Sequence, residues 1–145
     1  MRMQAPVVID TNVVLDLFVF SDPRTGPLRQ SLNDSSLQWL ATPPMREELR
    51  RVLDYPQLQP RLAFYALTAD QVLARFDQQA KLVDVPAKAS VTCSDPDDQK
   101  FIDLAVAHQA LLLSKDKAVL SMRKRLLALA VPVDTAMQAI ATATP

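Results

Sequence analysis

The feature that most constrains the fold is a short β-branched run that ends abruptly in polar side chains. Residues 7–9 (Val-Val-Ile) are followed directly by Asp10, Thr11 and Asn12. Such a run is typical of a strand buried on both faces of a parallel sheet. Open parallel sheets carry their chemistry just past the carboxyl ends of their strands. We therefore expect Asp10 to stand at a strand tip, where capping the following helix is the alternative role.

Length and composition predict one globular domain covering residues 1–145. The chain is long enough to bury a hydrophobic core, and 49% of its residues are hydrophobic. No apolar stretch approaches the roughly 20 residues that span a bilayer. The single cysteine, Cys93, cannot form an internal disulfide. These features predict a cytoplasmic protein without a membrane partner.

Strand-like and helical segments alternate along the chain. We expect strands at 6–9, 37–41, 83–85, 110–113 and 131–133, and helices at 12–20, 27–33, 43–54, 61–66, 69–83, 96–109, 117–129 and 135–141. This alternation is typical of an α/β domain with a mainly parallel sheet.

Composition also argues against several kinds of site. The net charge is zero, so no global basic field indicates a nucleic-acid partner. The single glycine, Gly26, excludes a glycine-rich phosphate loop. The single histidine, His108, argues against a histidine-rich zinc site and against a Ser-His-Asp triad.

The helix expected at 43–54 carries two adjacent acids with different orientations. At about 100° per residue, Glu48 lies at the edge of the apolar stripe, whereas Glu47 points toward solvent. A carboxylate beside a buried face costs stability unless something there uses it. Glu48 is therefore the candidate functional acid of this helix.

Several acids crowd the start of the helix expected at 96–109. Asp95 and Asp97 are explained by capping and by the helix dipole. Asp98 shares a face with Ile102, so we expect it to point inward. Asp103 falls about 140° from Asp98 and outside the apolar stripe. Asp98 is thus the main candidate, with Asp97 and Asp103 as secondary ones, since a helix phase can slip by one residue.

Asp116 follows the expected strand 110–113, in the same topological position as Asp10. Four carboxylates from four segments are thereby expected to converge: Asp10, Glu48, Asp98 and Asp116. Left unpaired, such a cluster would repel itself strongly. Oxygen ligands without histidine or cysteine suit Mg²⁺ or Mn²⁺, which can support phosphodiester hydrolysis.

Four segments carry a resemblance to a known family. They are residues 8–12 (VIDTN), 48–53 (ELRRVL), 95–105 (DPDDQKFIDLA) and 113–117 (LSKDK). In this order they resemble the PIN-domain superfamily, and within it the VapC-like toxins of toxin–antitoxin systems. The resemblance implies a three-layer α/β/α fold and a Mg²⁺- or Mn²⁺-dependent ribonuclease. It places the catalytic and metal-binding acids at Asp10, Glu48, Asp98 and Asp116.

The resemblance also implies roles around these acids. Asn12 and Ser114 would support them through hydrogen bonds, and the basic side chains Arg50, Arg51, Lys115 and Lys117 would hold the RNA backbone. The expected substrate is single-stranded RNA, and the expected partners are a second copy of the chain and a small antitoxin. Ser114-Lys115-Asp116 stands where the family usually has Thr-Gly-Asp, so Lys115 either contacts phosphate or weakens metal binding.

Two other interpretations remain open. A PIN domain with weak catalysis would bind RNA or a protein without cutting. A phospho-acceptor receiver or a dehalogenase-like phosphatase would need a second acid directly after the first strand. Asp10-Thr11-Asn12 does not supply that acid.

Overall fold

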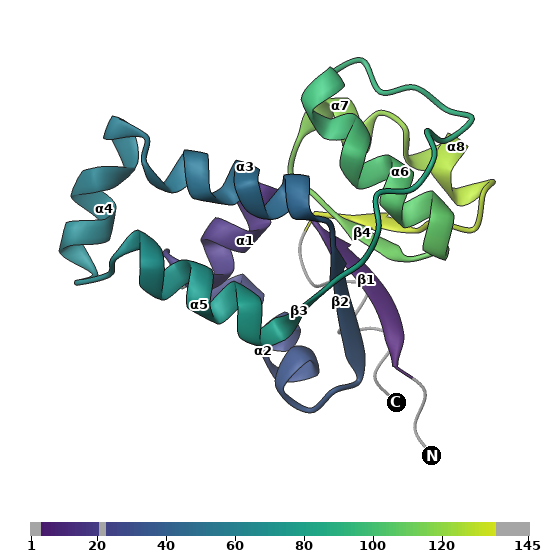
Figure 1. The fold of residues 1–145 in the computed structure, drawn as a ribbon. Helices are drawn as coiled ribbons and strands as arrows, with labels where there is room; N and C mark the ends of the chain where they lie inside the picture. Colours follow the sequence, from purple (N-terminus) through teal and green to yellow (C-terminus); the bar gives the residue numbers. More distant parts are fainter. Residues whose placement is uncertain (1–3, 21–22, 136–145) are drawn as a thin grey trace.

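The computed structural model describes residues 4–20 and 23–135, which form a parallel sheet covered by helices (Figure 1). The strands are β1 (Ala5–Ile9), β2 (Leu37–Ala41), β3 (Ala80–Leu82), β4 (Leu111–Leu113) and β5 (Val133–Asp134). Their order across the sheet is β3-β2-β1-β4-β5, and every pairing is parallel. Starting from β1, the chain adds β2 and β3 on one side and then β4 and β5 on the other.

The helices lie in two layers, one on each face of the sheet (Figure 1). The bounds of the first layer are α1 (Thr11–Phe18), α2 (Gly26–Asn33), α3 (Pro43–Leu53), α4 (Gln59–Phe64) and α5 (Ala69–Gln79). Those of the second are α6 (Gln99–His108), α7 (Lys117–Leu120) and α8 (Arg123–Leu127). Short 3₁₀ turns occur at Pro23–Thr25, Pro56–Leu58 and Pro96–Asp98. This confirms the three-layer α/β/α architecture predicted from the sequence.

An aromatic cluster fills the core under the first helix layer. Trp39 of β2 is 1% exposed and packs between Phe18 and Phe76, with ring centroids 5.8 and 5.0 Å away. Phe18 comes from α1 and Phe76 from α5, so one strand residue joins two helices to the sheet.

The third strand begins earlier than predicted. Helix α5 ends at Gln79, and β3 pairs with β2 at Ala80–Leu82 rather than at 83–85. Lys81 and Leu82 are exposed because β3 is an edge strand, so its sequence lacks the apolar run used to find buried strands.

The carboxyl-terminal elements also differ from the prediction. The helix expected at 117–129 is two short helices, α7 and α8, separated by Ser121 and Met122, of which Met122 is 1% exposed. The last strand is Val133–Asp134 rather than 131–133, since Pro132 has no N–H to donate and offers only its carbonyl to Leu112. The helix expected at 135–141 lies outside the described residues from position 136 onward.

Among the residues that the structure describes, no helix is both long enough and apolar enough to cross a bilayer.

The aromatic cluster predicts a sharp contrast between two phenylalanines. Phe76→Ala should lower the free energy of unfolding by about 3–5 kcal/mol, because Phe76 is 3% exposed and its removal leaves a cavity beside Trp39. Phe64→Ala is the matched control: at 80% exposure it should change stability by less than about 0.5 kcal/mol. Urea denaturation of both variants measures the difference, and equal losses would contradict this packing.

Candidate functional site

The site lies where the strand order reverses, at the carboxyl ends of β1 and β4. The parallel register pairs Ile9 with Leu113, which brings the next residues, Asp10 and Ser114, side by side. Asp10 is 3% exposed and Ser114 is fully buried. The Ser114 hydroxyl donates a 2.6 Å hydrogen bond to Oδ2 of Asp10. Sheet pairing thus fixes the first acid of the site.

Asp10 and Asp116 both cap helices as well as belonging to the site. The backbone N–H of Asn12 donates to Oδ1 of Asp10 at 3.3 Å, and that of Ala118 donates to Oδ1 of Asp116 at 2.9 Å. The Asp116 N–H in turn donates to the Ser114 hydroxyl at 3.1 Å. Capping and a functional role are therefore compatible, because the cap fixes where each carboxylate points.

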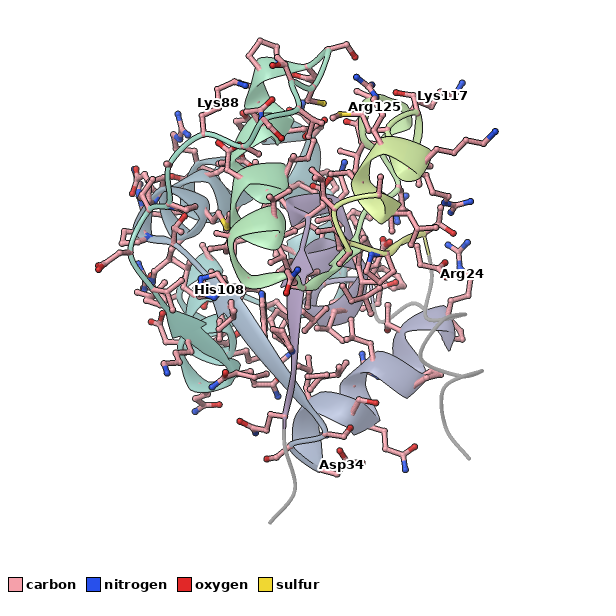
Figure 2. The ribbon with its side chains drawn as sticks, turned by 90° about the vertical axis from the view of Figure 1, so that its right-hand side faces the viewer. Arg24, Asp34, Lys88, His108, Lys117 and Arg125 are labelled. Carbon is pink, nitrogen blue, oxygen red and sulfur yellow. The ribbon has the colours of Figure 1, made fainter. Side chains whose placement is uncertain are left out.

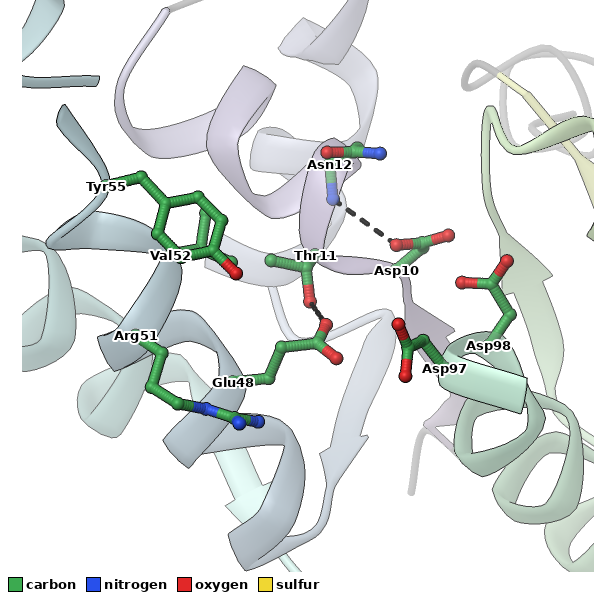
Figure 3. A pocket seen from close by; sticks show the side chains of 9 residues that line it. All are labelled: Asp10, Thr11, Asn12, Glu48, Arg51, Val52, Tyr55, Asp97 and Asp98. Carbon is green, nitrogen blue, oxygen red and sulfur yellow. Dashed lines mark hydrogen bonds between the residues drawn. The ribbon is translucent and has the colours of Figure 1, made fainter. Parts of the chain in front are cut away.

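Glu48 reaches the site from α3 and is held at both oxygens. The Thr11 hydroxyl donates to Oε1 at 2.5 Å (Figure 3), and the Lys100 ammonium forms an ion pair with Oε2. Glu47 faces solvent and pairs with Arg50 at 2.5 Å. The helical phase read from the sequence therefore separated these neighbouring acids as the structure does.

Asp98 points inward, although the local geometry is a 3₁₀ turn rather than the α-helix expected there. It is 7% exposed, and its Oδ2 atom has no hydrogen-bond partner. Carboxylate oxygens of Asp95, Asp98 and Asp116 lie within 4.8 Å of one another. Asp95 also accepts from the Asp97 N–H at 3.0 Å, so the residue interpreted as a cap belongs to the acidic cluster too.

Asp98 also borders a cavity of about 250 Å³ (Figure 3), whereas Asp95 and Asp116 are not among its lining residues. Its lining residues are Asp10, Thr11, Asn12, Glu48, Arg51, Val52, Tyr55, Asp97 and Asp98. In Figure 3, Glu48, Arg51 and Tyr55 lie on one side, while the carboxylates of Asp97 and Asp98 lie on the other. The cavity is therefore acidic at one end and has a guanidinium and an aromatic ring at the other.

The surroundings of two aspartates, Asp10 and Asp98, raise their pKa values. Burial, followed by the charge of Asp10 and by the side-chain hydrogen bond with Asp116 and its charge, raises the pKa of Asp98 to about 8. Burial also raises the pKa of Asp10, opposed by the hydrogen bonds from Ser114 and the Asn12 backbone. A bound cation would relieve both effects, because it favours the charged form of each carboxyl.

Asn12 was predicted to support the acids through hydrogen bonds and Asp103 to be a secondary site acid, and the structure places both differently. Asn12 acts on Asp10 through its backbone N–H, and its side chain lines the cavity. Asp103 accepts from the Ala89 N–H at 2.9 Å and from the Gln99 amide at 2.8 Å. It therefore anchors the segment before α6 and lies away from the cavity lining.

The predicted RNA-backbone residues separate into two groups. Arg51 lines the cavity, whereas Arg50 pairs with Glu47 on the outer side of α3. Lys115 forms a 2.6 Å ion pair with Asp16 of α1, so its charge is partly compensated outside the acidic cluster. Lys117 is exposed on α7 (Figure 2).

Besides Asp95, three site residues were missed by sequence reasoning: Thr11, Tyr55 and Lys100. Thr11 is buried directly after Asp10, and Tyr55 lies four residues beyond Arg51, after the end of α3. Lys100 lies two residues after Asp98, at the start of α6. A basic residue in the first turn of a helix is unfavourable for the helix dipole, and this signal could have identified it.

Comparison with known proteins agrees with this geometry. A family model described as PIN domain matches residues 6–118, so the chain belongs to the PIN-domain family. PIN domains are generally nucleases, and they usually depend on a divalent metal. An uncharacterized protein of the archaeon Methanocaldococcus jannaschii is 24% identical over 125 residues, covering 84% of this chain and 77% of that protein. This match confirms the predicted PIN-domain superfamily, and all four motifs lie inside the matched residues.

Because its pKa is raised, Asp98 is expected to make the folded protein less stable as the pH rises. Its ordinary pKa is 3.8 and its folded value is about 8, so between these pH values the folded, metal-free protein holds a proton that the unfolded chain has lost. The free energy of unfolding therefore falls as pH rises across this range. We expect Asp98→Asn to weaken this dependence and to raise stability at pH 8 by about 1–3 kcal/mol.

Thermal melts followed by circular dichroism in EDTA measure this effect. Asp97→Asn is the matched control, because Asp97 is the exposed neighbour and should leave the pH dependence unchanged. An Asp98→Asn variant with the same pH dependence as the wild type would contradict the assignment.

Proposed function

We propose that this protein is a Mg²⁺- or Mn²⁺-dependent endoribonuclease that hydrolyses phosphodiester bonds of single-stranded RNA. The observation that carries this proposal is the unpartnered Oδ2 atom of Asp98, buried beside Asp95 and Asp116. A buried carboxylate oxygen without a partner is costly, and neighbouring carboxylates add to the cost. A hard divalent cation supplies the missing partner, since the donors are all oxygens.

The chain's own residues prepare this site. A divalent ion bound there supplies a lowered pKa for water and positive charge for the leaving oxygen. Ser114 and the Asn12 N–H hold the two oxygens of Asp10 in place. The Asp116 carboxylate is fixed by its cap on α7. Such preorganisation keeps the ligands in position before the substrate arrives.

The far wall of the cavity supports a single-stranded nucleic acid as substrate. Arg51 and Tyr55 line it, and the Tyr55 side is open to solvent, with 47% of the residue exposed. An arginine beside the acids can bind a flanking phosphate without regard to sequence. An exposed aromatic ring stacks on bases that are not paired, as in proteins that bind single strands. The Tyr55 ring thus selects an unpaired base next to the cleaved bond.

The first test is cleavage of a labelled single-stranded RNA in Mg²⁺, Mn²⁺ or EDTA. Asp10→Asn should reduce cleavage by more than about 100-fold, because even the outer partners of a metal site contribute 10–100-fold. Asp84→Asn is the control, since Asp84 is exposed and far along the chain from the cavity lining. Equal cleavage by Asp10→Asn and the wild type would overturn the proposal.

The same experiment separates the alternative function. If neither protein cuts the RNA in any metal while gel shifts show binding, the chain is a PIN domain that acts as a binding module. The arrangement of Asp98 favours the enzyme, because a module that only binds RNA gains nothing from a buried, unpaired carboxylate.

Stacking on Tyr55 predicts a specific loss of affinity. Tyr55→Ala should weaken binding of a short single-stranded RNA by about 5- to 150-fold, which corresponds to 1–3 kcal/mol for one base. Tyr55→Phe should keep most of the affinity, because the ring is retained. Tyr65→Ala is the matched control, since Tyr65 is a similarly exposed tyrosine outside the cavity lining.

Fluorescence anisotropy in EDTA measures this binding without cleavage. A Tyr55→Ala variant that binds as well as Tyr65→Ala would exclude stacking at this position.

The resemblance to PIN-family toxins extends the proposal to partners. We propose that the chain forms a homodimer and that a small antitoxin protein silences it by covering the acidic cavity. Light scattering after gel filtration tests the homodimer. Growth of cells expressing the wild type or Asp10→Asn tests toxicity, which should disappear in the variant.

A further inference from the structure

Lys100 lies against the acidic site, in contact with two residues that line its cavity, Glu48 and Asp97. Its ammonium ion-pairs with Oε2 of Glu48 and donates a 2.5 Å hydrogen bond to the Asp97 carbonyl. It also lies 5.1 Å from the centre of the Phe101 ring. The Lys100 and Glu48 side chains are only 26% and 19% exposed. Three contacts at low exposure therefore fix this cation in one position.

This position is unfavourable for the helix that carries the lysine. Lys100 is the second residue of α6, where the helix dipole repels a positive charge. Its partner Glu48 belongs to a different element, α3, so the ion pair is a contact between two helices and not a local pair within α6. The pairing therefore reflects the requirements of the site rather than those of α6.

The contacts divide the acids into two groups. Glu48 has a partner on each oxygen, Thr11 and Lys100. The aspartate group, by contrast, contains the unpartnered oxygen of Asp98. In the part of the chain that the structure describes, Lys100 is the basic side chain that ion-pairs with a carboxylate of the cavity. Lys100 therefore supplies a positive charge at Glu48, whereas none of the described basic side chains forms an ion pair with Asp98.

We propose that Lys100 is a resident cation that takes the place of a second divalent ion, so that the site binds one Mg²⁺ or Mn²⁺ at its aspartates and none at Glu48. This rests on the proposed function, which requires the aspartate ion but leaves the number of ions open. Lys100 is then a positioning residue. It holds Glu48 against Thr11 and keeps a fixed positive charge between the Glu48 carboxylate and the Asp97 carbonyl.

The test counts the Mn²⁺ ions bound at fixed pH, by electron paramagnetic resonance of free Mn²⁺ and by calorimetry. The wild type should bind one ion. Lys100→Met, which keeps the length of the side chain but removes its charge, should bind a second, weaker ion at the released Glu48 carboxylate. Lys100→Arg should still bind one, and the double variant Lys100→Met with Glu48→Gln should return to one.

Each outcome bears on a different claim. Two ions in the wild type, or one in a folded Lys100→Met variant, would overturn the role of Lys100 and leave the proposed nuclease standing. No ion in the wild type would overturn both. Glu48→Gln in the wild-type background gives a check that does not need the lysine variant to fold. It should change the affinity of the single ion by less than threefold, and a tenfold loss would show that Glu48 is a ligand of that ion.

Discussion

The hydrogen bond from Ser114 to Asp10 joins the two central strands at the point where the site begins. It depends on the parallel register of β1 and β4, which places these residues at neighbouring strand ends. Because the chain passes from β1 to β3 before adding β4, the two halves of the site come from opposite ends of the sequence. A shift of one residue in this register would turn the side chains toward the other face. The acidic cluster therefore depends on the sheet more than on any helix.

Several contacts of the site offset part of the repulsion between the carboxylates that meet at this point. Burial and then the neighbouring negative charges raise the pKa of Asp98, and the protein compensates only some of these charges. Hydrogen bonds stabilise Asp10, an ion pair stabilises Glu48, and Asp98 keeps an oxygen without a partner. Incomplete compensation is typical of a functional site, since full compensation would leave nothing for a cation to gain.

The sequence predicted the parts of this arrangement that depend on local pattern. Asp10 and Asp116 follow recognisable strands, and the position of Glu48 follows from helical periodicity on α3. Asp98 was predicted to face inward from the phase of a helix, although a 3₁₀ turn delivers it. The edge strand β3 was misplaced because exposed strands lack an apolar run. The unfavourable place of Lys100 in the first turn of α6 was readable from the sequence, but its partner was not, because Glu48 lies 52 positions away on another helix.

The orientation of helix α3 determines which of its side chains line the cavity. Met45, Leu49 and Leu53 form its buried stripe, so packing against the core fixes the rotation of the helix about its axis. Glu48 and Arg51 are three residues apart on α3 and lie along one edge of that stripe, and Tyr55 follows two residues after the helix ends. A carboxylate, a guanidinium and an aromatic ring thus line up in order away from the aspartates. Under the proposed function, a bound strand has its cleaved phosphate at the aspartates, the next phosphate at Arg51 and an unpaired base at Tyr55, and the buried stripe of α3 fixes the direction in which Glu48 and Arg51 point.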